Sequence, residues 1–178
     1  MKLALDLILL ITLLVFQASS GTGSDLITES CKDASKGDPN INFDFCVASL
    51  KAKSASPPTS PEELVTMSIQ ITKSNGTNIV STISDLLKDP KFNYYAKKCL
   101  QDCSELYSDA LSDLDDAIVA LKSKDFNSAN TEISAAMTNS VTCEDQFMDG
   151  NEKSPLTQEN KIYFELNAMS LAFIQMQK

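Results

Sequence analysis

Apolar residues recur every three or four positions along four long stretches of the chain, which is the period of an amphipathic helix. The clearest run consists of Cys99, Cys103, Leu106, Ala110, Leu114, Ala117 and Leu121. The same period appears over residues 64–86, 126–147 and 162–176. Each such helix has one apolar face that only its neighbours can cover, and the connections are short. The pattern therefore predicts an all-α, up-and-down four-helix bundle over residues 60–178.

Helix-starting residues stand before each run. Ser60–Glu63 supplies a capping serine, a first-turn proline and a glutamate at the third helical position, so the first helix should begin there and continue to about Leu87. Asp89-Pro90 separates it from the second helix, Asp125 is a favoured N-cap for the third, and Ser154-Pro155 should begin the fourth.

Asn75-Gly76 is the weak point of the first helix, because this dipeptide is normally a turn signal. Glycine in a helix interior costs about 1 kcal/mol relative to alanine. With Thr77, these residues also form the sole N-glycosylation sequon of the chain. The sequence therefore predicts a helix with an exposed, glycosylated Asn75.

Residues 24–52 precede the bundle as a separate unit, because serines and prolines crowd the linker at residues 53–61. Cys31 and Cys46 flank the turn-forming residues Asp38–Asn40. A disulfide between these two cysteines would close a small N-terminal helical hairpin.

The N-terminus has the pattern of a secretory signal peptide. Met1 and Lys2 precede an apolar run over residues 3–16, and small residues follow at positions 18–21. A membrane anchor would need about 20 apolar residues, and this run is shorter and contains Asp6. We therefore predict a signal peptide over residues 1–23 and a secreted mature chain of about 155 residues, which suits one domain.

The charge and composition narrow the classes of function. The formal net charge is −9, which disfavours nucleic acid and anionic membranes as partners and favours a basic protein. Histidine is absent, which removes the commonest general base and the commonest metal ligand. Asp113, Asp115 and Asp116 resemble part of a calcium loop but lack its glycine and its later glutamate. We expect no enzyme activity, no metal and no cofactor.

Five cysteines in a secreted chain imply two disulfides and one free thiol. Cys31 and Cys46 are the nearest pair. Cys99 and Cys103 are four residues apart on one predicted helix, where Cβ atoms lie about 5–6 Å apart, farther than a disulfide allows. Each of them therefore pairs better with Cys143 than with the other. The spacing does not decide whether Cys99 or Cys103 forms that bridge.

Acidic residues follow the second bundle helix at steps of three and four: Asp102, Glu105, Asp109, Asp113 and Asp116. We call these five residues the acidic ridge. Like charges at this spacing destabilise a helix by a few tenths of a kcal/mol per pair. A basic groove on a partner protein would remove that repulsion.

Several short motifs together resemble one protein family. They are Asn42–Cys46, Asp102-Cys103 with Tyr107, Ser134–Ala136, and Thr142–Asp145 followed by Phe147. The chain looks like a plant invertase and pectin methylesterase inhibitor domain spanning residues 24–178, and is most similar to a branch of pollen allergens. The resemblance implies a four-helix bundle with an N-terminal hairpin, a second bridge from Cys103 to Cys143, and a free Cys99.

The resemblance implies two target enzymes. Pectin methylesterase inhibitors lay bundle helices across the groove of the esterase, and the matching positions here are Glu105, Asp109, Thr142 and Asp145. A further acidic position of such inhibitors is Ser112 here. Because the acidic ridge suits such contacts, a one-to-one complex with a plant pectin methylesterase in the apoplast or cell wall is our leading expectation.

The alternative target is an acid invertase of the cell wall or vacuole. Invertase inhibitors of this family insert a Pro-Lys-Phe loop into the sugar-binding cleft, just before the third bundle helix. The chain has Lys124, Asp125 and Phe126 at that place, while a literal Pro90-Lys91-Phe92 occurs one helix too early. A third hypothesis is a secreted helical protein that carries a ligand or has a structural role.

Overall fold

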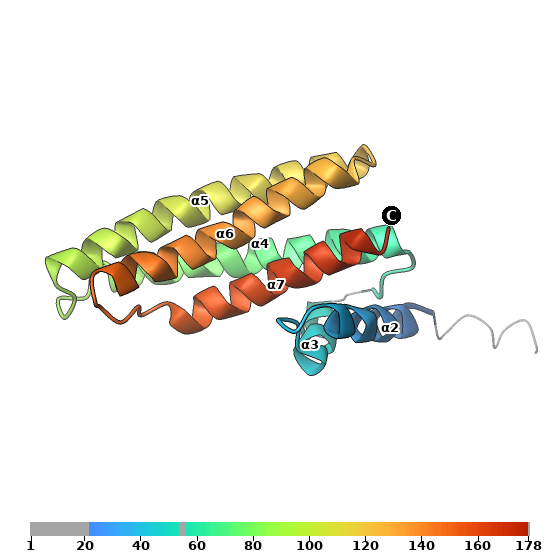
Figure 1. The fold of residues 1–178 in the computed structure, drawn as a ribbon, viewed down its shortest axis with the longest axis horizontal. Helices are drawn as coiled ribbons and strands as arrows, with labels where there is room; N and C mark the ends of the chain where they lie inside the picture. The colour runs from blue at the N-terminus through green and yellow to red at the C-terminus, as the bar shows by residue number, and fades with distance from the viewer. Residues whose placement is uncertain (1–21, 54–55, 178) are drawn as a thin grey trace, which may run out of the picture.

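The computed structural model describes residues 22–53 and 56–177, and Figure 1 shows them as helices joined by short connections. The predicted signal peptide lies outside the described residues except for positions 22 and 23, which begin the first helix. The helices are α2 (Thr22–Gly37), α3 (Phe43–Lys53), α4 (Pro61–Leu86), α5 (Tyr94–Lys122), α6 (Phe126–Asp149) and α7 (Thr157–Gln175).

Helices α4 to α7 form the predicted antiparallel bundle. Each packs against two others, because α5 contacts α4 and α6, and α7 contacts α4 and α6. Figure 1 shows the α5–α6 pair running above the α4–α7 pair, with successive helices in opposite directions. The all-α, up-and-down four-helix architecture is therefore confirmed.

Capping contacts explain where three of these helices begin. The Ser60 Oγ accepts a hydrogen bond from the Glu63 N–H at 3.2 Å, and the Glu63 carboxylate accepts from the Thr59 N–H at 2.6 Å. The latter bond lowers the pKa of Glu63. Asn93 caps α5 through the Ala96 N–H at 2.8 Å, and Asp125 caps α6. The starts expected at Ser60 and Asp125 are confirmed.

The fourth bundle helix begins later than Ser154-Pro155 predicts. Its first residue is Thr157, and Leu156 at the N-cap supplies no side-chain bond. The Ser154 Oγ instead accepts from the Leu156 N–H at 3.1 Å, which turns the chain before the helix starts. The serine therefore stabilises a turn and not the helix end.

Helix α4 runs through Asn75-Gly76 without a break. A Cβ atom at position 76 would lie 3.0 Å from Cε2 of Tyr163 and 3.2 Å from Cδ2 of Leu111. The glycine therefore lets α4 approach α5 and α7 closely, which offsets its poor helix propensity. The expectation of an exposed Asn75 is wrong, because α3 and α7 border its side chain and leave it half-buried.

Two tyrosines absent from the predicted apolar stripes lie in the core. Tyr107 and Tyr163 are fully buried, with ring centroids 5.0 Å apart in an edge-to-face arrangement. The Tyr107 hydroxyl donates to Oδ1 of Asn160 at 2.7 Å. Burial raises the pKa of both tyrosines. Met176, which the stripe places in the core, is 45% exposed because it lies beyond the end of α7.

The N-terminal hairpin is also confirmed. Cys31 and Cys46 form a disulfide between α2 and α3, with Cα atoms 5.8 Å apart. Asp38 stabilises the turn by accepting from the Asn40 N–H at 2.9 Å. The hairpin lies beside α7 and α4 (Figure 1), and the Asn42 N–H donates to Oε1 of Glu165 on α7 at 2.8 Å.

Candidate functional site

A buried disulfide joins the two helices that carry most of the predicted contact residues. Cys103 on α5 and Cys143 on α6 are bonded, with Cα atoms 5.0 Å apart, and both are inaccessible to solvent. Cys99 is a free, buried thiol whose Sγ lies 3.6 Å from the carbonyl oxygen of Gln146. The structure thus confirms the pairing that the family resemblance implies.

The acidic ridge lies on the outer side of α5. Glu105, Asp109 and Asp116 are exposed, while Asp102 and Asp113 are half-buried. Within residues 22–53 and 56–177, none of the five forms an ion pair. By contrast, Asp115 on the α4 side of the same helix pairs with Lys73. The ridge therefore presents carboxylates with no neutralising cation.

Asp113 is a half-buried member of the ridge with a raised carboxyl pKa. Burial raises its pKa, and the negative charges of Glu132, Asp109 and Asp116 raise it further. Glu132 belongs to α6, so the ridge gains a carboxylate from the neighbouring helix. The sequence pattern misses Glu132, because its closeness to Asp113 depends on how the two helices are packed.

Removing the charge at Asp113 is expected to stabilise the fold. Asp113→Asn should raise the melting temperature at about pH 7 by about 1–3 °C, because the burial cost of the charged carboxylate and three like-charge repulsions disappear. The folded-state pKa is raised, so the repulsion is present above that pKa and is lost as the pH falls and Asp113 becomes protonated. Thermal denaturation at about pH 3 should therefore show no gain.

Asp115→Asn is the matched control for this measurement. Asp115 is on the same helix but pairs with Lys73, so neutralising it should not raise the melting temperature. An equal gain in both variants would mean that net charge, and not the neighbours of Asp113, sets the effect.

Thr142 and Asp145 occupy different surroundings on α6. Thr142 is next to Cys143 and is half-buried, and its hydroxyl donates to the carbonyl of Thr138 at 3.1 Å. Asp145 is exposed and lines a hollow of about 260 Å³ between α6 and α7. Of the four predicted contact residues, only Thr142 adjoins a cysteine of the bridge; Glu105 and Asp109 lie on the exposed side of α5, and Asp145 borders the α6–α7 side.

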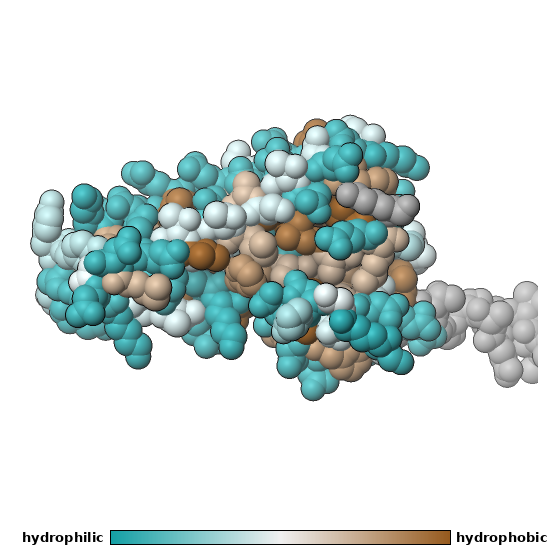
Figure 2. Space-filling model, viewed as in Figure 1, coloured by the Kyte–Doolittle hydropathy of each residue, from teal (hydrophilic) through white to brown (hydrophobic). Residues whose placement is uncertain are grey.

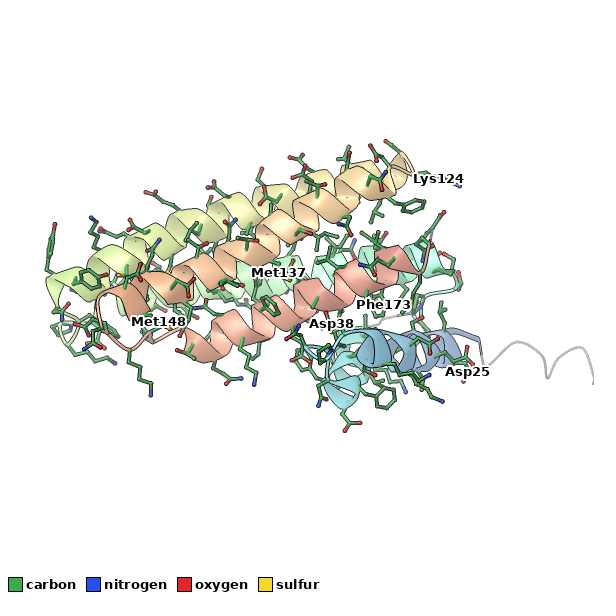
Figure 3. The ribbon with its side chains drawn as sticks, in the orientation of Figure 1. Asp25, Asp38, Lys124, Met137, Met148 and Phe173 are labelled. Carbon is green, nitrogen blue, oxygen red and sulfur yellow. A yellow bond between two sulfur atoms is a disulfide. The ribbon has the colours of Figure 1, made fainter. Side chains whose placement is uncertain are left out.

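Local side-chain contacts stabilise the turn between α5 and α6. Lys124 has a φ of 59°, a left-handed conformation that is uncommon outside glycine. Asp125 accepts from the N–H and the hydroxyl of Ser128 at 3.0 and 2.7 Å, which lowers the pKa of Asp125. The Lys124 Nζ lies 3.7 Å from Oε1 of Glu62 on α4. We call Lys124–Phe126 the α5–α6 turn, and Figure 3 shows Lys124 at the tip where these helices meet.

Phe126 lies half-buried beside a groove at the same end of the bundle. The groove has a volume of about 460 Å³ and is bordered by the start of α4, including Glu62 and Met67, and by the end of α5. Pro90-Lys91-Phe92 lies in the α4–α5 connection at the opposite end, where Lys91 pairs with Asp89 at 2.9 Å. Three helices of the bundle thus build the surface around the α5–α6 turn.

Glu144 has a structural role that the sequence pattern does not reveal. Its carboxylate accepts from the Thr157 hydroxyl at 2.6 Å and from Nδ2 of Asn160 at 2.7 Å. Both partners belong to the first turn of α7, so Glu144 ties α6 to the start of α7. The glutamate of the Thr142–Asp145 motif therefore stabilises the packing of α6 against α7.

The surface of the molecule is predominantly polar on the visible face. Figure 2 shows hydrophilic residues along the outer edge of α5 and α6, and apolar residues gathered between α6 and α7. In the described ranges, no cluster of acidic and cysteine side chains is arranged to hold a metal ion. No helix in the same ranges has the length and apolar character needed to cross a bilayer.

Known proteins match this chain over nearly its whole length. Residues 25–173 match the family described as plant invertase/pectin methylesterase inhibitor. A protein of Platanus acerifolia named "Putative invertase inhibitor" is 38% identical over 99% of this chain and 98% of its own. "Pectinesterase inhibitor 12" of Arabidopsis thaliana is 35% identical over 96% of this chain and 98% of its own.

A solved structure agrees with the fold. The crystal structure of a mutant form of a pectin methylesterase inhibitor from Arabidopsis superposes with a TM-score of 0.66 at 23% identity, covering 76% of this chain and 90% of the other. The bundle, the hairpin and the family match together lead to one conclusion. This chain belongs to the plant invertase/pectin methylesterase inhibitor family, whose members are proteinaceous inhibitors and not enzymes.

Proposed function

We propose that this protein is secreted to the cell wall or vacuole and inhibits an acid invertase by placing the α5–α6 turn at the entrance of its sugar-binding cleft. The observation that carries the proposal is the geometry of that turn, in which the left-handed backbone of Lys124 and the Asp125 cap present an exposed lysine side chain at the end of the bundle. The named relative from Platanus supports the same choice of target.

The rigidity of the turn bears directly on affinity. A flexible loop loses conformational entropy when it enters a cleft, and each immobilised long side chain costs about 0.5–1.5 kcal/mol. Here the Asp125 cap orders the start of α6 before binding, whereas the pair between Lys124 and Glu62 is solvent-exposed and adds little. Lys124 is 74% exposed and presents a cation that a carboxylate in a hydrolase cleft can bind. Inhibition then follows from steric occlusion, without any chemistry by this chain.

The test is a titration of the purified mature chain against a plant acid invertase and a plant pectin methylesterase in parallel. Lys124→Glu should raise the inhibition constant for invertase at least about tenfold, because charge reversal at a contact costs more than about 1.4 kcal/mol. Lys91→Glu is the matched control, since Lys91 is 66% exposed and also pairs with a carboxylate, but lies at the other end of the bundle.

Pectin methylesterase is the second candidate target, and the unneutralised acidic ridge is the observation that favours it. Glu105, Asp109 and Thr142 would then contact a basic groove on the esterase, and binding would weaken with salt. Asp109→Lys should weaken that inhibition, whereas Glu29→Lys, at an exposed site on the hairpin, should not.

Each outcome of the titration selects one function. Invertase inhibition that depends on Lys124 but not on Lys91 supports the proposal. Esterase inhibition that depends on Asp109 supports the second candidate instead. If both enzymes keep full activity at micromolar inhibitor, neither function holds, and a ligand-carrying or structural role replaces them.

A further inference from the structure

The sequon residue Asn75 lines a hollow on the surface of the molecule. This hollow has a volume of about 220 Å³ and lies where α3, α4 and α7 meet. It opens to solvent beside the docked hairpin. Because Asn75 is in the fourth turn of α4, its side chain projects from a rigid helix and not from a loop.

The side-chain oxygen of Asn75 lacks a hydrogen-bond partner within the described ranges. This Oδ1 is enclosed and unpaired, which is costly for a buried acceptor. Thr77, the other essential residue of the sequon, is exposed. A group that occupied the hollow and carried an N–H or O–H donor would satisfy Oδ1.

The walls of the hollow combine apolar and polar groups. Phe45 on α3 and Ile162 on α7 supply apolar surface, while Ser49 on α3 and Asn78 on α4 supply polar side chains. A sugar ring has this same mixture, with C–H groups that pack on an aromatic face and hydroxyls at its rim. The hollow is also of the size of a single sugar ring.

We propose that Asn75 carries an N-linked glycan whose first N-acetylglucosamine occupies this hollow and holds the N-terminal hairpin against the bundle. The linkage forms when the Asn75 Nδ2 attacks the anomeric carbon of an oligosaccharide carried on a lipid pyrophosphate. The new C–N bond replaces the C–O bond to the pyrophosphate, which leaves with the electron pair, and the amide loses one proton to the transferase.

The seated sugar would connect elements that have few other ties. The hairpin contacts the bundle mainly where α2 meets α7 and where α3 meets α4. Among the described residues, the Asn42 N–H of the hairpin donates a hydrogen bond to the side-chain carboxylate of Glu165 on α7, and this bond joins the two parts. A sugar attached to α4 and packed on Phe45 of α3 adds a second attachment, so its loss should loosen α3 first.

The experiment uses the full chain, with its own N-terminal segment, expressed in plant secretory cells. Intact mass spectrometry shows whether a glycan is present, and hydrogen exchange measures protection of the α3 amides. Three forms are compared: the glycoprotein, the same protein trimmed by an endoglycosidase to one N-acetylglucosamine, and Thr77→Ala, which lacks the sequon. Thr77→Ser keeps the sequon and serves as the matched control for the substitution.

The glycoprotein, the trimmed form and Thr77→Ser should protect α3 equally, while its amides should exchange about tenfold faster in Thr77→Ala. Exchange within α5 and α6 should be the same in all forms, which shows that the variant folds. Three results would overturn the proposal: an unglycosylated wild-type protein, equal α3 protection in every form, or greater α3 protection in Thr77→Ala because a glycan blocks docking.

Discussion

Replacing Cys103 and Cys143 together with serine is expected to lower the melting temperature by about 8–16 °C. The bridge spans 40 residues, and in the chain-entropy account a loop of that length stabilises the folded state by about 4 kcal/mol. For a domain of this size each kcal/mol corresponds to about 2–4 °C. Thermal unfolding of the oxidised proteins by circular dichroism measures the effect.

The double replacement avoids an ambiguity that a single one would create. Cys103→Ser alone leaves Cys143 and Cys99 free to pair, since Cys99 is one helical turn from Cys103 on the same side of α5. Cys99→Ala is the control, because this thiol is unbridged and its loss should lower the midpoint by no more than about 3 °C. Equal midpoints for the double variant and the oxidised wild type would contradict the role given to the bridge.

Replacing Glu144 with alanine should have the next largest effect on stability. The variant loses two hydrogen bonds to a charged acceptor, to Thr157 and to Asn160, and Asn160 is only 4% exposed. Hydrogen bonds to charged groups contribute about 1.5–3 kcal/mol each, or about 3–6 kcal/mol for the two. Because Glu144 is only half-buried, we expect the lower end, a loss of about 3 kcal/mol and about 6–12 °C. The first turn of α7 also loses its nearby negative charge, and Leu156 offers no side-chain cap in compensation.

Two further variants separate these causes. Asp145→Ala removes a neighbouring exposed carboxylate on α6, and its midpoint should stay within about 1 °C of wild type. Glu144→Gln keeps the shape of the side chain but removes the charge, and should give an intermediate midpoint. If Glu144→Ala unfolds at the same temperature as Asp145→Ala, the contacts with α7 do not stabilise the bundle.

Part of the candidate site could be read from the sequence because it lies along single helices. The acidic ridge follows from the helical period alone, and Asp125 follows from capping chemistry at a helix start. The contacts that cross between helices could not be read in this way. Asp113 with Glu132, and Lys124 with Glu62, come from segments whose relative rotation depends on packing.

Local patterns alone determined the helical class of this protein, the four bundle helices, the hairpin and the start of α4 at Ser60. These features depend on residues within a few positions of one another, where the 3.6-residue period and capping bonds act. The tertiary structure decided the rest: why Gly76 fits within a continuous helix, why Tyr107 and Tyr163 are buried, and why Glu144 belongs to the packing of α7. Each of these depends on the approach of segments far apart in the chain, because steric fit and shared hydrogen bonds exist only after the helices have packed.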